Sequence, residues 1–308
     1  MTETVILAGA SGVFGRHVTK VLTGAGYRVL GLGRGAGNDI RADINDREAL
    51  LRALSGQQAD IVVHAATALA KVPMRHRDFT PTDVLRTTGM RNLVEGYHAV
   101  GASLMINESM MFGYGYGDHG DAPLTEGKTP FAPVQRDRHL EEHVGAMRVK
   151  EELTRSLGGV SLRFGLFYGP GGATEEMVAM LRKRKLPAPD AGTRVLSWVR
   201  LDDAATAVLA AIRHGRPGEA YNIADDAPMS FAGHVRAAAA TFGAPKPMAV
   251  PLWLLRPMSL VHAVVSTNLR LGTAKAHAEL GWEPRYPSAA EGLAEMKAEA
   301  SKAGTVTA

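Results

Sequence analysis

Gly9, Gly12 and Gly15 have the spacing of a phosphate-binding loop. They follow a short apolar run, Val5 to Ala8, and the pattern of a helix begins directly after them. The first glycine permits a tight turn, the second lets a pyrophosphate approach the backbone, and the third lets helix and strand pack closely. The helix N-terminus favours negative charge. We therefore predict a dinucleotide site whose phosphate contacts come from Gly9, Ser11, Gly12, Val13, Phe14 and Gly15.

The side chain that contacts the adenosine ribose is expected about 20 positions further on, at the end of the second strand. Arg34 occupies that position. An acidic side chain there would bond two ribose hydroxyls, whereas a guanidinium pairs with a 2′-phosphate in bidentate fashion. We therefore predict NADP(H) rather than NAD(H), with Asp39 as a competitor if its loop folds back. Asp43 and Ile44 are predicted to meet the adenine.

These residues require a framework of parallel strands. The N-terminal half repeats a short β-branched run, a turn and a helical stretch, which is typical of strands joined by crossover helices. We predict strands over 5–8, 27–32, 61–64, 103–106, 160–164 and 220–223, and helices over 14–25, 45–56, 81–100, 140–156 and 201–213. The fold class is α/β, with a Rossmann-type doubly wound parallel sheet. Residues 1–165 with 198–224 form the dinucleotide-binding domain, and 166–197 with 225–308 form a smaller C-terminal substrate-binding lobe.

The composition excludes several kinds of chemistry. The chain has 308 residues and no cysteine, so disulfides, thiolate metal sites and cysteine nucleophiles are excluded. A net charge of +4 is too small to indicate nucleic acid, and we expect the basic run 182–185 to be a solvated helix end. Glu3 and the short first apolar run argue against a signal peptide, and charges and prolines interrupt the apolar stretch 249–271. We expect no membrane span and a cytoplasmic location.

Further motifs follow the glycine loop along nearly the whole chain. They are His64-Ala65-Ala66, Thr88 to Leu93, Arg163 to Gly171, Trp198 to Ala205 and Tyr221-Asn222-Ile223. Together they resemble the extended and atypical short-chain dehydrogenase/reductases, the NAD-dependent epimerase/dehydratase family. The resemblance implies that the cofactor is also contacted by Ala65, Ala66, Lys150 and Phe167.

The usual chemistry of this family needs a Ser or Thr after the fourth strand and a YxxxK pair on the next helix. The lysine lowers the tyrosine pKa and holds the nicotinamide ribose, while the tyrosine exchanges a proton with the substrate. The resemblance makes Ser109 the hydroxyl donor, although an ungapped alignment puts Glu108 there. Lys150 matches the lysine, but Ala146 stands four residues before it. A standard Tyr–Lys mechanism therefore cannot operate from this helix.

Four side chains are candidate substitutes for the tyrosine. Tyr114 and Tyr116 lie in a glycine-rich loop beside the fourth strand. We rank Tyr114 first because its spacing from Ser109 resembles that of atypical members of the family. His143 lies seven residues before Lys150, about 10.5 Å along a helix axis, and His139 is a turn further away. The alternatives are a packing role for the tyrosines, surface positions for the histidines, and an exposed lysine on the helix.

The leading functional hypothesis is an NADP(H)-dependent oxidoreductase that acts on a small carbonyl, imine or sugar-like substrate. One alternative is an epimerase, dehydratase or cyclase of the same family with no net redox change, and another is an NADP-binding sensor without turnover. Asp118, His119 and Asp121 supply too few converging ligands to indicate a metal site. The partner is a small molecule, and the sequence permits a homodimer through the helices predicted at 81–100 and 140–156.

Overall fold

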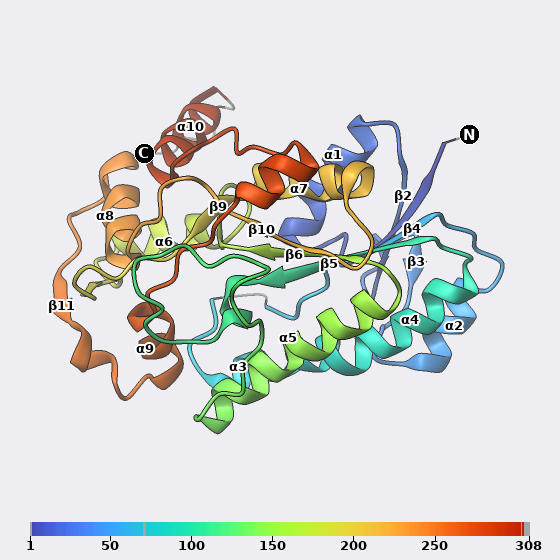
Figure 1. The fold of residues 1–308 in the computed structure, drawn as a ribbon. Helices are drawn as coiled ribbons and strands as arrows, with labels where there is room; N and C mark the ends of the chain where they lie inside the picture. The colour runs from blue at the N-terminus through green and yellow to red at the C-terminus, as the bar shows by residue number, and fades with distance from the viewer. Residues whose placement is uncertain (1, 70–71, 303, 305–308) are drawn as a thin grey trace.

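Parallel strands form the central sheet of the computed structural model, which describes residues 2–69, 72–302 and 304. Within these residues the sheet has seven strands in the order β10-β6-β5-β4-β1-β2-β3 (Figure 1). Their bounds are β1 Thr4–Ala8, β2 Arg28–Gly33, β3 Ile40–Arg41, β4 Ile61–His64, β5 Leu104–Met110, β6 Val160–Phe164 and β10 Ala220–Ile223. The order reverses between β1 and β4, and ligands of such sheets bind beyond the carboxyl ends of the strands at that point. The predicted Rossmann-type fold is confirmed.

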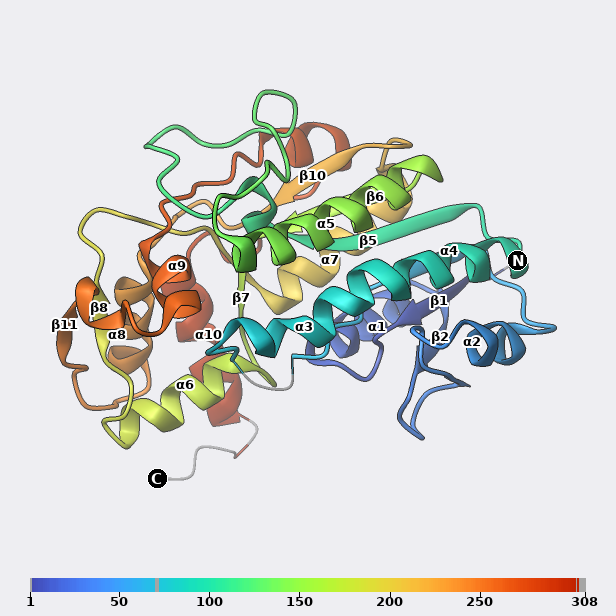
Figure 2. The same cartoon turned by 90° about the horizontal axis from the view of Figure 1, so that it is seen from below.

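Helices cover both faces of the sheet (Figures 1 and 2). On one face lie α1 (Val13–Gly24) and α7 (Leu201–His214), and on the other lie α2 (Arg47–Leu54), α4 (Met90–Ala99) and α5 (Arg138–Ser156). Side chains of β1 point alternately into the two layers, Leu7 toward α1 and Ile6 toward α4. A strand buried on both faces has no polar side, which explains its continuous apolar run.

Two predicted helix starts are wrong. The helix expected at 81–100 begins earlier, as α3 (His76–Val84), and continues through a π-helical turn over Leu85–Gly89 into α4. Pro81 therefore lies inside the helix rather than at its first turn, where proline is most readily accommodated. The helix expected to be capped by Asn45 is capped by Asp46, whose Oδ1 accepts a hydrogen bond from the backbone N–H of Ala49 at 2.9 Å.

The C-terminal elements lie beside the sheet, and most of them contribute to a second apolar centre. They are β7 (Leu166–Tyr168), α6 (Ala173–Arg182), β8 (Ala188–Asp190), β9 (Trp198–Arg200), α8 (Phe231–Thr241), β11 (Ala249–Pro251), α9 (Ser259–Ser266) and α10 (Ala289–Lys302). Trp198 stacks on His234 at 3.8 Å between ring centroids, among buried side chains of α8 and α10. The predicted helix end at the basic run is confirmed, because α6 ends at Arg182 and the run is exposed. Within the described ranges, no helix is both long and apolar enough to cross a membrane.

A buried carboxyl group follows β10. Asp225 is 3% exposed, and its Oδ2 has no hydrogen-bond partner among the described residues. Burial, with the neighbouring carboxylates of Asp226 and Asp203, raises the pKa of Asp225 to about 8. The unfolded chain releases this proton near pH 4, so the folded state binds more protons between pH 4 and pH 8. Its stability therefore falls across that range.

Replacing Asp225 by asparagine should remove this pH dependence. The amide keeps an oxygen that can accept the bond from the Ala227 N–H, and it carries no charge that burial would penalise. We expect the variant to exceed the wild type in free energy of unfolding by about 2 to 5 kcal/mol at pH 8, and by about 1 kcal/mol or less at pH 4.5. Urea unfolding at the two pH values measures the difference. An equal effect at both values would contradict this assignment.

Candidate active site

The glycine loop lies against the segment that follows β4. Gly9 has a φ of +93°, and a Cβ at this position would lie 2.7 Å from the Cα of Ala66 and 2.8 Å from the carbonyl carbon of Ala65. Gly12 precedes the first residue of α1, so the free N–H groups of the first helical turn face the loop. A Cβ on Gly15 would collide with the backbone of Gly9. These predicted cofactor residues therefore lie together at the point where the strand order reverses.

The predicted adenosine side contains both of the charged side chains considered for the ribose. Arg34 is exposed, and its guanidinium lies 3.9 Å from a carboxylate oxygen of Asp43. The carboxylate of Asp39 accepts a hydrogen bond from the N–H of Gly31 at 2.8 Å. A cavity of about 370 Å³ lies there, lined among others by Ser11, Arg16, Asn38 and Asp39. Asp39 thus lines the cavity beside the glycine loop, while the exposed Arg34 pairs with Asp43.

Two further predicted cofactor residues are packed rather than open. Ile44 is 4% exposed, and its carbonyl accepts a hydrogen bond from the side chain of Asn92. Phe167 stacks on Phe14 at 4.9 Å and tilts against Phe164 at 5.2 Å. This aromatic cluster supports the first turn of α1 beneath the loop.

Lys150 is enclosed at the carboxyl ends of β4 and β5. It is 1% exposed, and its ammonium donates to the carbonyls of Glu108 at 2.6 Å and His64 at 3.3 Å. A third contact at 3.2 Å reaches the carboxylate of Glu108. Burial lowers the pKa of Lys150 to about 8, and Glu108 opposes this effect. The alternative of an exposed lysine is therefore wrong. Ala146, one turn earlier on α5, is also buried and brings no acid or base.

The two registers considered for the serine place two consecutive residues of β5, Glu108 or Ser109, at that position. Glu108 holds the lysine through its carboxylate. Ser109 is 4% exposed, and its Oγ has no hydrogen-bond partner among the described residues. Buried hydroxyls are normally paired, so an unpaired one at the end of a strand is suited to a ligand. Ser109 follows Glu108 directly in β5, so its hydroxyl is an unpaired donor near the carboxyl end of that strand.

Tyr114, our first-ranked substitute, lies in the core. It is 1% exposed, and its hydroxyl donates to Asn222 at 2.8 Å and accepts from Arg163 at 2.9 Å. Burial raises the pKa of Tyr114 to about 12. Its position argues against the proton-transfer role, because both hydrogen bonds are made inside the protein. Tyr116 lies nearer the surface and stacks on Phe112 at 4.8 Å.

His143 is buried rather than on the surface. It is 1% exposed, its Nδ1 lies 2.6 Å from a carboxylate oxygen of Asp83, and its Nε2 lies 3.1 Å from Nδ1 of His76. Neither Asp83 nor His76 was predicted as a site residue from the sequence. Asp83 and Arg86 are one turn apart and form an ion pair at 3.3 Å, and that spacing was the only local signal.

The residues considered for a metal have protein partners. Asp118 accepts from the side chain of Asn268, His119 contacts the carbonyl of Gly115, and Asp121 pairs with Arg270. In the described ranges no group of three His, Cys, Asp or Glu side chains could hold a metal ion.

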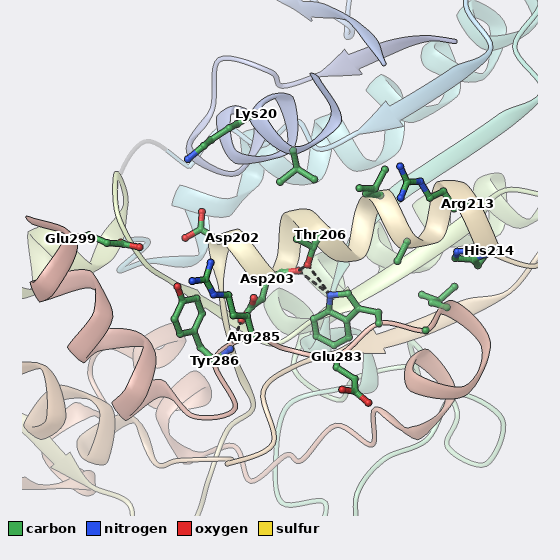
Figure 3. A pocket seen from close by; sticks show the side chains of 16 residues that line it. Lys20, Asp202, Asp203, Thr206, Arg213, His214, Glu283, Arg285, Tyr286 and Glu299 are labelled. Carbon is green, nitrogen blue, oxygen red and sulfur yellow. Dashed lines mark hydrogen bonds between the residues drawn. The ribbon is translucent and has the colours of Figure 1, made fainter. Parts of the chain in front are cut away.

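A second cavity, of about 600 Å³, lies among α1, α7 and the residues around Trp282 (Figure 3). The Trp282 indole N–H contacts the carbonyl of Asp203 at 3.1 Å and Oγ1 of Thr206 at 3.0 Å. Acidic and basic side chains alternate around it, including Asp202 and Arg213. The cavity includes no residue of the glycine loop, of the end of β5 or of α5, so we place the candidate site at the strand ends.

The chain is similar to known proteins over most of its length. The model of the NAD dependent epimerase/dehydratase family matches residues 5–224. A "3-diazoavenalumate denitrifying reductase" from Streptomyces sp is 33% identical, over 94% of this chain and 98% of that protein. A "Probable dTDP-glucose 4,6-dehydratase" from Sinorhizobium fredii is 26% identical, over 71% of this chain and 70% of that protein.

Among solved structures, UDP-glucose 4-epimerase from Thermotoga maritima superimposes with a TM-score of 0.77 at 21% identity. The superposition covers 97% of this chain and 99% of that one. At this identity the likeness concerns the fold alone. The family match and the full-length relative carry more weight. The chain therefore belongs to the NAD-dependent epimerase/dehydratase family and is an enzyme of that family.

Proposed function

We propose that this enzyme is an NADP(H)-dependent reductase that replaces the nitrogen of a small diazo compound by hydride. Two observations together support the proposal. A relative that aligns over 94% of this chain and 98% of its own length is named a denitrifying reductase of a diazo compound. The helix that carries Lys150 has alanine where the family's tyrosine would stand. A reaction that needs hydride but no proton from the enzyme accounts for both.

The residues at the strand ends fit a dinucleotide. The glycine loop leaves no room for a Cβ at Gly9 or Gly15, and the first turn of α1 offers free N–H groups. The guanidinium of Arg34 is exposed, so a 2′-phosphate can replace Asp43 as its partner. The unpaired hydroxyl of Ser109 lies at the edge where the reacting end would bind. When bound, the nicotinamide supplies a hydride equivalent.

The charge of the site favours an electrophile that needs no acid. The ammonium of Lys150 makes three contacts with Glu108 and His64, and the Glu108 carboxylate neutralises it. A carbonyl group reduced here would become an alkoxide without a tyrosine to protonate it. A diazonium carbon instead gains hydride with its electron pair, the C–N bond breaks, and that bond's electron pair leaves on N₂. Atoms and charges balance without a proton, which revises our expectation of a carbonyl, imine or sugar-like substrate.

Turnover of a carboxybenzenediazonium salt under anaerobic conditions tests the proposal. We expect NADPH consumption, N₂ release and the corresponding benzoate in equal amounts, above the rate without enzyme. The Gly15→Ala variant serves as the matched protein control, because its glycine loop is blocked. N₂ release at the uncatalysed rate, with no enzyme-dependent loss of NADPH, would contradict the proposal.

A family member without net redox change is the second candidate, and the dTDP-glucose dehydratase relative favours it. That function would convert a nucleotide sugar while the NADPH absorbance stays constant. The same spectrophotometric assay, with a nucleoside diphosphate sugar in place of the diazonium salt, separates the two functions.

The NADP(H) preference has its own test at Arg34. Replacing Arg34 by alanine should weaken NADPH binding about 10- to 150-fold, the range expected for charge-assisted hydrogen bonds, and leave NADH binding nearly unchanged. Arg28, exposed at the other end of β2, is the matched control, and Arg28→Ala should bind NADPH like the wild type. Fluorescence titration measures the affinities. Equal losses for NADPH and NADH would contradict the 2′-phosphate assignment.

A further inference from the structure

Four side chains form a continuous hydrogen-bonded chain where α3, α5 and α9 meet. Oγ of Ser259 lies 3.1 Å from Nε2 of His76, and Nδ1 of His76 lies 3.1 Å from Nε2 of His143. Nδ1 of His143 lies 2.6 Å from a carboxylate oxygen of Asp83. Ser259 and Asp83, the two ends of this hydrogen-bonded chain, are 176 positions apart in the sequence, so only the tertiary fold brings them together.

With both imidazoles neutral, the contacts allow one direction for each hydrogen bond. Asp83 also accepts from Arg86, and a carboxylate has no proton to give, so Nδ1 of His143 donates to it. Nε2 of neutral His143 must then accept from Nδ1 of His76. Nε2 of neutral His76 is left as the acceptor for the hydroxyl of Ser259. This is the order of a nucleophile, a base and the groups that orient the base.

We propose that Ser259 is the nucleophile of a second catalytic site, which hydrolyses small carboxylic esters. Solvent exposure decreases along the hydrogen-bonded chain from Ser259 to His143, as a site with an accessible nucleophile requires. Ser259 is exposed, His76 is half-buried and His143 is 1% exposed. Ser259 is also the first residue of α9, so N–H groups without partners inside the helix lie beside its hydroxyl. They can stabilise an oxyanion.

Ser259, His76 and one water molecule account for every bond and proton in the proposed ester hydrolysis. Oγ of Ser259 attacks the ester carbonyl carbon while its proton passes to Nε2 of His76. The tetrahedral oxyanion collapses, the C–O bond to the alcohol breaks, and His76 returns the proton to the departing oxygen. Water, deprotonated by the same nitrogen, then releases the acid from the acyl-serine. His143 and Asp83 act through His76, and they stabilise its transient positive charge as positioning residues.

The surroundings keep His76 in its basic form. Burial and the imidazoles of His143 and His139 lower the pKa of His76, while the carboxylates of Asp137 and Glu142 on the same side oppose this shift. His139 stacks on His76 at 5.0 Å. A neutral imidazole at neutral pH is the form that accepts the serine proton.

The site shares no residue with the proposed dinucleotide site, so its activity should not require NADP(H). The full-length protein is treated with a fluorophosphonate probe and assayed with 4-nitrophenyl acetate, with and without NADPH. We expect a single phosphonate adduct, located on Ser259 by peptide mass spectrometry, and hydrolysis that rises with pH to a plateau. Ser259→Ala should abolish the adduct, and His76→Gln should slow both reactions at least 100-fold.

Ser266 provides a matched control for the Ser259 variant. Ser266 lies on the same helix and contacts only the carbonyl of Ala263 among the described residues, so Ser266→Ala should react like the wild type. Asp83→Asn should slow acylation about 10-fold without removing the adduct. Circular dichroism and NADPH titration show whether each variant is folded. Labelling of wild type no faster than of heat-denatured protein, or an adduct elsewhere, would overturn the proposal. Ester hydrolysis that Ser259→Ala leaves unchanged would do the same.

Discussion

Replacing Arg163 by methionine should lower the free energy of unfolding by about 3 to 5 kcal/mol, the usual cost of removing one partner of a buried ion pair. Arg163 is 6% exposed, and its guanidinium makes a bidentate pair with Glu151, with contacts of 2.7 to 3.2 Å. It also donates to Tyr114 and lies over the ring of Phe131 at 3.7 Å. Methionine would fill much of the space but leave the carboxylate of Glu151 buried and unpaired. Urea unfolding measures the loss.

Two companion variants show that the loss comes from the unpaired charge. Arg155→Met changes an exposed arginine of α5 and should alter stability by no more than about 0.5 kcal/mol. Combining Arg163→Met with Glu151→Met should recover part of the loss, because the buried charge is then absent. A loss for Arg163→Met as small as that for Arg155→Met would show that the pair contributes little.

Gly15→Ala should reduce NADPH affinity about 100-fold or more, which corresponds to about 2.7 kcal/mol. The added methyl group would collide with the carbonyl oxygen of Gly9 and lie 2.8 Å from the Cα of Ala10, and backbone atoms cannot move aside as a flexible side chain can. The loop must therefore shift away from the first turn of α1, and the phosphate contacts are lost with it. Isothermal titration with NADPH measures the change.

Gly24, at the other end of α1, is the matched control. A methyl group there would meet no atom within 4 Å. Gly24→Ala should leave NADPH affinity unchanged and raise stability slightly, because alanine loses less backbone entropy in a helix. If Gly15→Ala bound NADPH as tightly as Gly24→Ala, the glycine loop would not be the phosphate site.

The parts of the site that depend on local patterns could be predicted from the sequence. The glycine spacing and the apolar run before it determine a strand, a turn and a helix within 24 residues, and the structure forms these elements. The lysine on α5 was found by its family motif. Its burial and its pairing with Glu108 could not be predicted, because they depend on how α5 packs across the ends of β4 and β5.

The errors also have physical reasons. Glycines beside Tyr114 suggested a mobile loop, but Arg163 holds its hydroxyl from β6, and no local pattern linked the two residues. His143 was weighed as a surface residue on the general placement of histidine side chains in proteins. The aspartate that contacts it lies 60 positions earlier, on α3. Ser259 carries no motif at all, and only the packing of α9 against α3 places it beside His76.

The most direct test of the proposed function follows the hydride itself. The enzyme reacts with a carboxybenzenediazonium salt and NADPH that carries deuterium at one of the two C4 positions, and mass spectrometry of the benzoate gives its isotope content. We expect one deuterium in the product from one C4 epimer and none from the other, together with one N₂ for each NADPH consumed. Benzoate without enzyme-dependent deuterium from either epimer would contradict the proposed hydride transfer.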